Sequence, residues 1–235
     1  MKIKNNYGFT LMELSAVLVI MLVLTGIIYS SRKIINTSRI ANAINLTAQA
    51  DFIDDDSLVL WLETSVMSRE NKTGYISSWQ DLSKSKIYFE TNSGSLTFTD
   101  SSILPSVKSI KFDGSNYLES SISLNLNKYT AFIVAKSNST GDIYDTGFVF
   151  NSSELGENKI VSIKNTGSAK YMKTAKASTF TSISNSDNLS SSPSKFYIGS
   201  NDFIGEILEI IIFDKILSDL EILKIDNYLL NKYRK

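Results

Sequence analysis

Few side chains in this sequence have the type and spacing of a catalytic or metal-binding site. The 235 residues include no histidine and no cysteine, which excludes imidazole and thiolate metal ligands, Ser-His-Asp and Cys-His catalysis, and disulfide bonds. Carboxylates and aromatic rings are the groups that remain. Three acids are notable for their position: Glu13 lies inside an apolar stretch, and Glu206 and Glu209 lie in an apolar run near the C-terminus.

Paired carboxylates hydrolyse glycosidic bonds with retention when they face each other about 5–5.5 Å apart. Glu206 and Glu209 are three positions apart, and in a regular strand an odd separation places side chains on opposite faces. The spacing therefore argues against hydrolysis, and we expect no enzymatic activity and no cofactor. Calcium takes about six to eight oxygen ligands, of which the acid-rich segment Asp142–Asp145 supplies only some, so we expect no metal site.

The weak candidates for ligand binding are Trp79 and Asp81. Trp79 is followed by polar Gln80 and Asp81 in what reads as a turn, and an exposed indole ring can stack on a ligand. Trp61, by contrast, lies in the apolar run Leu58–Glu63 and is predicted to be a core residue. Asp113 precedes a glycine and is expected to cap a turn.

The charge balance gives no sign of a nucleic-acid partner. Lys and Arg together number 24, as do Asp and Glu, so the formal net charge is zero. Proteins that bind polyanions through their whole surface carry a basic excess, and we expect no nucleic acid among the partners.

The strongest pattern lies at the N-terminus. A short polar segment with Lys2 and Lys4 precedes the apolar run Phe9–Ser31, in which Leu14–Ser31 is a stretch of 18 residues without a charge. This length suits a helix that spans a bilayer, with the basic end favouring the cytoplasmic side. Glu13 is the only charge in the run, and a carboxylate there is costly unless it has a function.

The segment Gly8-Phe9-Thr10-Leu11-Met12-Glu13 resembles the class III signal of type IV pilins and of the pseudopilins of type II secretion. The resemblance implies that residues 1–8 are a leader, that a prepilin peptidase cuts between Gly8 and Phe9, and that the new amine of Phe9 is methylated. It also implies that Glu13 faces the N-terminus of a neighbouring subunit during assembly. A buried carboxylate is tolerable when it is paired, and an α-ammonium group would provide the pairing.

The apolar helix is expected to continue as a stalk, so that helix and stalk together occupy residues 9–53. Apolar side chains recur at helical intervals through residues 32–53, and no glycine or proline interrupts them. The acidic segment Asp51–Asp56 marks the boundary with the next domain, and a solvated hinge is favoured over a cation site.

Residues 57–235 are predicted to form a mainly antiparallel β-sandwich, of the jelly-roll type, closed by a C-terminal helix. The overall class is therefore α+β. Many short apolar or alternating runs separated by Ser, Asn, Gly and Asp are typical of such sandwiches, whereas the polar segment 184–194 reads as a loop. The terminal helix begins with a capping box formed by Ser218 and Glu221. The expected strands are Leu58–Glu63, Ile87–Glu90, Ser95–Phe98, Ser109–Asp113, Ala131–Lys136, Gly147–Asn151, Lys159–Ile163, Tyr171–Lys173, Thr179–Ile183, Lys195–Ile198 and Gly205–Asp214.

Several of these runs, taken in order, resemble bacterial LamG-like, concanavalin A-type domains. They are residues 58–63 (LVLWLE), 78–83 (SWQDLS), 110–118 (IKFDGSNYL), 130–135 (TAFIVA) and 205–214 (GEILEIIIFD). The resemblance implies a head that binds glycans or proteins.

Three functions follow as hypotheses. The first is a minor type IV pilin-like subunit that displays a lectin-like head, made as a precursor in the bacterial inner membrane and moved to a pilus at the cell surface. The second is a pseudopilin of a type II secretion system, acting in the periplasm. The third is a membrane-tethered enzyme acting on carbohydrates. The expected partners are the prepilin peptidase, other pilin or pseudopilin subunits, the inner membrane, and a glycan or protein ligand.

Overall fold

The structure is a computed structural model, and it describes residues 10–70, 74–120, 122, 124, 126, 128–138, 141–145, 149–155, 160–183 and 195–233. The chain divides into two compact units, residues 1–39 and residues 40–235. A 38-residue helix, α1 (Leu11–Ala48), begins in the first unit and ends in the second. The predicted long apolar N-terminal helix is confirmed, although it ends at Ala48 and not near residue 53.

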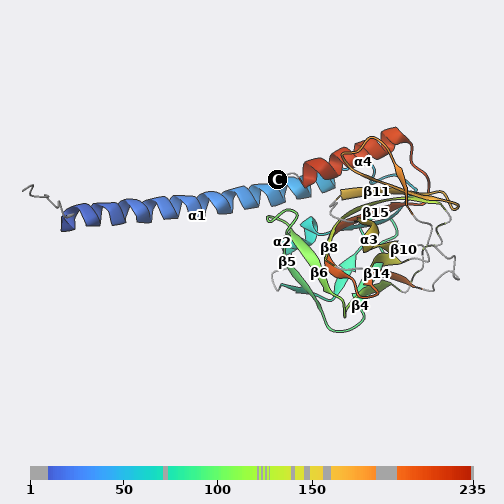
Figure 1. Cartoon of the computed structure of the whole chain (residues 1–235), viewed down its shortest axis with the longest axis horizontal. Coiled ribbons are helices and arrows are strands. Elements are labelled where there is room, and N and C mark those ends of the chain that lie inside the picture. Colours follow the sequence, from blue (N-terminus) through green and yellow to red (C-terminus); the bar gives the residue numbers. More distant parts are fainter. Residues whose placement is uncertain are drawn as a thin grey trace, which may run out of the picture. The chain divides into compact units, whose positions relative to one another are not determined.

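The second unit is a sandwich of two antiparallel sheets (Figure 1), as predicted. The larger sheet has the strand order β13-β12-β11-β8-β15-β6-β5-β2, and β1 pairs with β15 beyond the end of β6. The smaller sheet has the order β10-β9-β14-β7-β4-β3. The strands are β1 (Leu58–Glu63), β2 (Tyr75–Ile76), β3 (Ser78–Gln80), β4 (Tyr88–Thr91), β5 (Leu96–Asp100), β6 (Lys108–Asp113), β7 (Leu118–Ser120), β8 (Tyr129–Ser137), β9 (Asp142–Asp145), β10 (Val149–Asn151), β11 (Ile160–Asn165), β12 (Lys170–Thr174), β13 (Thr181–Ile183), β14 (Phe196–Ser200) and β15 (Ile204–Phe213).

Every predicted strand overlaps an observed one, and four short strands were not predicted. These are β2, β3, β7 and β9, which have two to four residues each and too few positions to show a period. The segment Asp142–Asp145, expected to be an acid-rich loop, is strand β9 instead. Asp142 is buried there and accepts hydrogen bonds from the side-chain amides of Asn151 and Asn201. The polar segment 184–194 lies outside the described residues.

Two apolar clusters hold the unit together, one on each face of the larger sheet. The inner cluster fills the space between the sheets, with Ile133 and Ile210 from the larger sheet and Phe89 and Phe196 from the smaller. The outer cluster lies between the larger sheet and the terminal helix α4 (Asp219–Lys232). Strand β15 is buried on both faces and contributes alternate side chains to the two clusters, as its nearly continuous apolar sequence predicts.

The C-terminal helix begins as predicted. The Ser218 hydroxyl accepts a hydrogen bond from the Glu221 amide, and the Glu221 carboxylate accepts one from the Ser218 amide at 2.7 Å. Two short helices, α2 (Ser65–Glu70) and α3 (Ser152–Leu155), were not predicted.

Candidate functional site

The N-terminal part of the candidate site begins at Thr10, because Gly8 and Phe9 lie outside the described residues. Thr10 and Glu13 form a capping box at the start of α1. The Glu13 carboxylate accepts hydrogen bonds from the Thr10 amide at 2.9 Å and from the Thr10 hydroxyl at 3.0 Å, and the Glu13 amide donates to the Thr10 hydroxyl at 3.2 Å. The spacing Thr-x-x-Glu gives this arrangement because the first helical turn leaves amide groups unpaired.

The capping box engages only one oxygen of the Glu13 carboxylate. Both bonds from Thr10 end on Oε2, while Oε1 accepts no hydrogen bond from any described residue. The carboxylate is therefore held in a fixed orientation at the start of the helix and keeps one oxygen available for a cation.

Helix α1 is long and apolar enough, by length and composition, to cross a membrane. Its large apolar side chains are exposed on every side; Leu11, Leu22 and Tyr29, for example, are each at least 75% exposed. A helix that is apolar all round needs lipid or other helices around it.

The residues predicted as weak ligand-binding candidates are inside the second unit, and this corrects the prediction. Trp79 lies at the centre of β3, between the exposed residues Ser78 and Gln80. Its side chain has no exposed surface, and its indole nitrogen donates to the Glu63 carbonyl at 3.1 Å. The strand alternation turns the ring inward, so it offers no face on which a ligand could stack.

Asp81 is equally buried and has a structural role. Its carboxylate accepts hydrogen bonds from the Trp61 amide at 2.7 Å and from the Ser83 amide at 2.8 Å. It thus ties the turn after β3 to strand β1. The expectations for Trp61 and Asp113 are confirmed, because Trp61 is a core residue and Asp113 accepts hydrogen bonds from the amides of Ser115 and Asn116.

The inference that Glu206 and Glu209 face opposite sides of their strand is wrong. The pairing of β15 with β8 shifts register between Ile207 and Glu209, which marks a β-bulge. Ile207 belongs to the inner cluster and Leu208 to the outer one, and the Glu209 carboxylate contacts outer-cluster residues. The extra residue therefore brings both acids to the outer face. Both are buried and accept several hydrogen bonds each.

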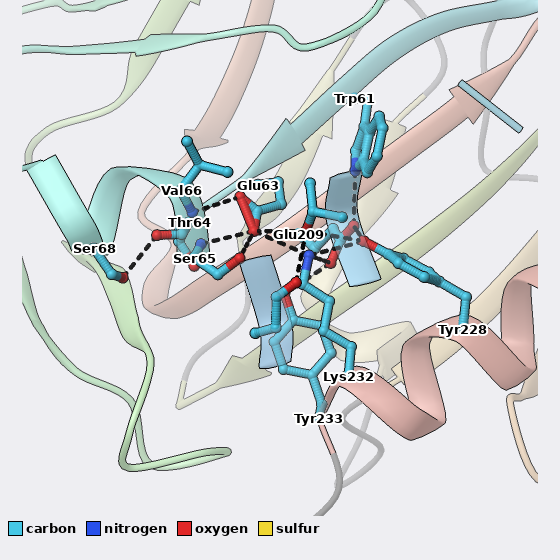
Figure 2. Close-up of polar contacts among 12 residues, drawn as sticks. Trp61, Glu63, Thr64, Ser65, Val66, Ser68, Glu209, Tyr228, Lys232 and Tyr233 are labelled. Atoms are coloured by element: carbon cyan, nitrogen blue, oxygen red, sulfur yellow. Dashed lines mark hydrogen bonds and ion pairs between the residues drawn. The ribbon is translucent and has the colours of Figure 1, made fainter. Parts of the chain in front are cut away.

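Glu209 is the centre of a buried polar network that sequence reasoning missed (Figure 2). Its carboxylate accepts hydrogen bonds from the Trp61 indole at 2.7 Å, from the Tyr228 hydroxyl at 2.9 Å and from the Tyr233 hydroxyl at 2.7 Å. The Lys232 ammonium lies 2.8 Å from Glu209 and 3.0 Å from Glu63, and none of these three charged side chains has exposed surface.

The network connects the end of α1 to the body of the second unit. The Thr47 hydroxyl donates to Glu63 at 3.2 Å, and Glu63 also accepts hydrogen bonds from the first amides of α2. Lys232 donates a third bond to the Tyr228 hydroxyl at 2.8 Å, so its three protons all have acceptors. Such full pairing makes buried charges tolerable.

The carboxylates also act on the two tyrosines. The pKa of both Tyr228 and Tyr233 is raised well above the ordinary value for tyrosine. Burial is the larger cause, and the negative charge of Glu209 is the second. Both hydroxyls therefore stay protonated as donors. The sequence contains one sign of this site, the helical spacing of Tyr228 and Lys232 with Tyr233 directly after them. The sequence alone does not connect these residues to Glu63 and Glu209.

Comparison with known proteins matches the first part of the chain to a family. A model of the prokaryotic N-terminal methylation motif matches residues 3–29. The chain thus carries a class III signal, as the residues Gly8–Glu13 predict. No curated protein matches the chain.

Several solved structures are similar to the chain at low sequence identity. Domain 4 of AbnA, an extracellular arabinanase from Geobacillus stearothermophilus in complex with arabinotriose, has a TM-score of 0.49 and 11% identity over 72% of this chain and 98% of that one. The binding domain of botulinum neurotoxin DC in complex with rat synaptotagmin II has a TM-score of 0.48 and 13% identity, over 74% of this chain and 52% of that one. Trypanosoma rangeli sialidase in complex with the inhibitor DANA has a TM-score of 0.45 and 13% identity, over 74% of this chain and 33% of that one. The chain thus spans about half of the toxin domain and a third of the sialidase.

Proposed function

We propose that this chain is a minor subunit of a type IV pilus, assembled through its N-terminal helix and displaying its second unit, residues 40–235, as a binding head. The observation that carries the proposal is the methylation motif at residues 3–29 together with the geometry of Glu13 at the start of an uncovered apolar helix. The precursor spans the inner membrane. After prepilin peptidase cuts between Gly8 and Phe9, removal of Lys2 and Lys4 gives the mature chain a formal net charge of −2.

The geometry of Glu13 supports its role in assembly. The free oxygen of its carboxylate lies at the helix start, and in sequence Glu13 is the fifth residue of a mature chain that begins with the methylated amine of Phe9. An incoming amine of a neighbouring subunit brings the positive charge that this carboxylate lacks in the single chain. In a medium of low dielectric constant such a pair is strongly favoured over an isolated carboxylate.

A large, separately folded head suits display better than a repetitive shaft. The head consists of two sheets and a covering helix and holds most of the residues of the chain. We therefore assign it a binding role, as the similarity to LamG-like domains implies, with a glycan or a protein as ligand. Hydrolysis is not part of the proposal, because Glu206 and Glu209 are buried and their oxygens are occupied by internal donors.

The test uses the full chain in a bacterium that has both type IV pili and type II secretion. We expect mature protein beginning with N-methylated Phe9 in filaments sheared from the cell surface. Gly8→Val should leave the full-length precursor in the inner membrane, because a β-branched side chain crowds the cleavage site. Mature protein in that variant would refute the assignment. Loss of protein secretion on deletion, with no chain in sheared filaments, would show a pseudopilin instead.

A further inference from the structure

An open cavity of about 510 Å³ lies on the larger sheet where β5, β6, β15 and β8 run side by side. Thr97 pairs with Lys111, Lys111 with Glu206, and Glu206 with Lys136, one residue from each strand. Residues paired in this way across antiparallel strands share one face of the sheet. All four line the cavity, as do Asn138 and Asp113.

The two carboxylates of the cavity accept hydrogen bonds from the chain itself, Glu206 on both oxygens and Asp113 on one. The Glu206 carboxylate accepts hydrogen bonds from the Ser102 amide at 3.0 Å, from the Ser102 hydroxyl and from the Ser109 hydroxyl at 2.7 Å. The Asp113 carboxylate accepts from the Ser115 hydroxyl and from the amides of Ser115 and Asn116, and these bonds lower its pKa. Both oxygens of Glu206 are therefore bonded within the chain, whereas the bonds to Asp113 all end on Oδ1 and leave Oδ2 able to accept a hydroxyl proton from a ligand.

Three side-chain donor groups that line the cavity, by contrast, have no acceptor among the described residues. Among the described residues, the ammonium groups of Lys111 and Lys136 form no ion pair or hydrogen bond, and the same is true of the Asn138 side-chain amide. The cavity therefore presents two cations and an amide with unused protons, next to the Glu206 carboxylate, whose two oxygens are already bonded. Such a site complements a ligand rich in acceptors and negatively charged.

We propose that this cavity binds an acidic sugar of a polysaccharide, with the sugar's carboxylate or sulfate between Lys111 and Lys136. The inference rests on the proposed binding role of the head and gives that role a site. A peptide is disfavoured because β5, β6, β15 and β8 are each paired on both sides, so an extended chain cannot join the sheet through its backbone. The cavity's own volume suits a few sugar units.

The experiment measures binding by the mature full-length protein in a nonionic detergent, using calorimetry. The probes are hyaluronan, which carries carboxylates, dextran sulfate, which carries sulfates, unsubstituted dextran, and poly-glutamate. We expect binding of hyaluronan, dextran sulfate or both, with affinity falling as salt is added. Comparison of the affinities for hyaluronan and dextran sulfate identifies whether the site prefers a carboxylate or a sulfate. Failure to bind either anionic polysaccharide, or equal binding of dextran or poly-glutamate, would overturn the proposal.

Variants then locate the site. Lys111→Gln with Lys136→Gln should weaken binding by about tenfold for each lysine removed. The matched control is Lys176→Gln with Lys224→Gln, which removes the same charge from exposed positions outside the cavity and should leave the affinity within about twofold of wild type. An equal loss in both double variants would show attraction to the whole surface and would overturn the proposal.

A second measurement does not depend on the variants folding. Bound polysaccharide should protect Lys111 and Lys136 of the wild-type protein from acetylation, read by mass spectrometry, while Lys176 reacts at its normal rate. Unprotected Lys111 and Lys136 in the presence of bound polysaccharide would overturn the proposal. Filament assembly is scored separately on sheared cells, so a chain that binds acidic sugar but never enters a filament refutes the pilus assignment and leaves the cavity assignment standing.

Discussion

At the scale of single residues, chemistry can separate the capping role of Glu13 from the assembly role that we propose for it. Its carboxylate caps the first turn of α1 through Thr10, and its second oxygen is open to a cation. Capping requires only an acceptor, whereas pairing with an α-ammonium group benefits from a full negative charge. Glutamine keeps the acceptor and loses the charge.

We expect Glu13→Gln to enter filaments as poorly as Glu13→Leu, because both variants lack the charge that a neighbouring amine would meet. Both should insert in the membrane and leave the melting temperature of the head unchanged. The measurement is the ratio of variant to wild-type protein in sheared filaments when the two are expressed together. Normal incorporation of Glu13→Gln would show that capping, and not pairing, is what assembly requires.

Tyr233 offers a test of the buried network through pH. Its pKa is raised in the folded chain, so above about pH 10, the ordinary value for tyrosine, the unfolded chain loses a proton that the folded chain keeps. The stabilising contribution is complete below that pH and is lost as the pH rises toward the folded-state pKa, at up to about 1.4 kcal/mol per pH unit for each such group.

Tyr233→Phe should lower the free energy of unfolding at pH 7 by about 1–3 kcal/mol, because Glu209 loses a buried donor. It should also reduce the fall in stability between pH 9 and pH 11, since one fewer proton is released on unfolding. Urea titrations of both proteins across this range measure the difference in slope. Identical slopes would contradict the burial of a protonated Tyr233.

At the scale of elements, α4 is fastened to the larger sheet by the Lys232 network and also by two ion pairs nearer its start, one buried and one exposed. Asp226 has no exposed side-chain surface and contacts the Lys173 ammonium of β12 and the Ser162 hydroxyl of β11. Asp219, at the start of the helix, is 90% exposed and lies 2.7 Å from the Lys164 ammonium of β11. The two pairs differ mainly in their access to water.

Lys173→Met should therefore destabilise the chain by about 3–5 kcal/mol, because it leaves the Asp226 carboxylate buried without its cation. The control is Lys164→Met, which breaks the exposed pair on the neighbouring strand and should cost about 1 kcal/mol or less. Denaturant midpoints of the two variants give the comparison. Equal midpoints would mean that water reaches Asp226, and that α4 is less firmly docked than its contacts indicate.

At the scale of the whole molecule, the boundary of the head lies within α1. The compact second unit begins at Ile40, and Ala43, Thr47 and Ala50 are buried in it. Phe52 packs against Trp61 and Tyr228, with ring centroids 5.0 and 5.3 Å apart. The acidic segment that follows is also tied down, because Asp55 pairs with Lys215 and Asp56 with Lys84. The last turns of the stalk helix thus form part of the head.

A fragment of residues 40–235 should be more stable than one of residues 57–235. Removing residues 40–56 takes away the half-buried Phe52 ring, for which about 1.5–3 kcal/mol is the value at full burial and so an upper bound, and also the Thr47 bond to Glu63. Both fragments should be soluble and rich in β-structure, since the apolar span lies outside them. Thermal melts at matched concentration make the comparison. Equal melting temperatures would place the boundary at residue 57 after all.

The features that the sequence alone determined are those whose physics is local. The capping box at Ser218 and Glu221, the class III signal at Gly8–Glu13 and the strands with enough alternating positions all depend on residues within one or two turns of each other. The apolar run of β15 likewise predicts its burial on both faces. Each of these signals arises from near neighbours in the chain.

Tertiary structure decided which groups meet and which faces are covered. The bulge in β15 turned Glu209 to the outer face, where it meets Lys232 from a helix 23 positions away and Trp61 from a strand 148 positions away. Trp79 was placed inside because a second sheet covers its strand, although its polar neighbours read as an exposed turn. These outcomes depend on contacts between distant segments, whose free energy no local pattern records, since the same residue is favourable or costly according to what packs against it.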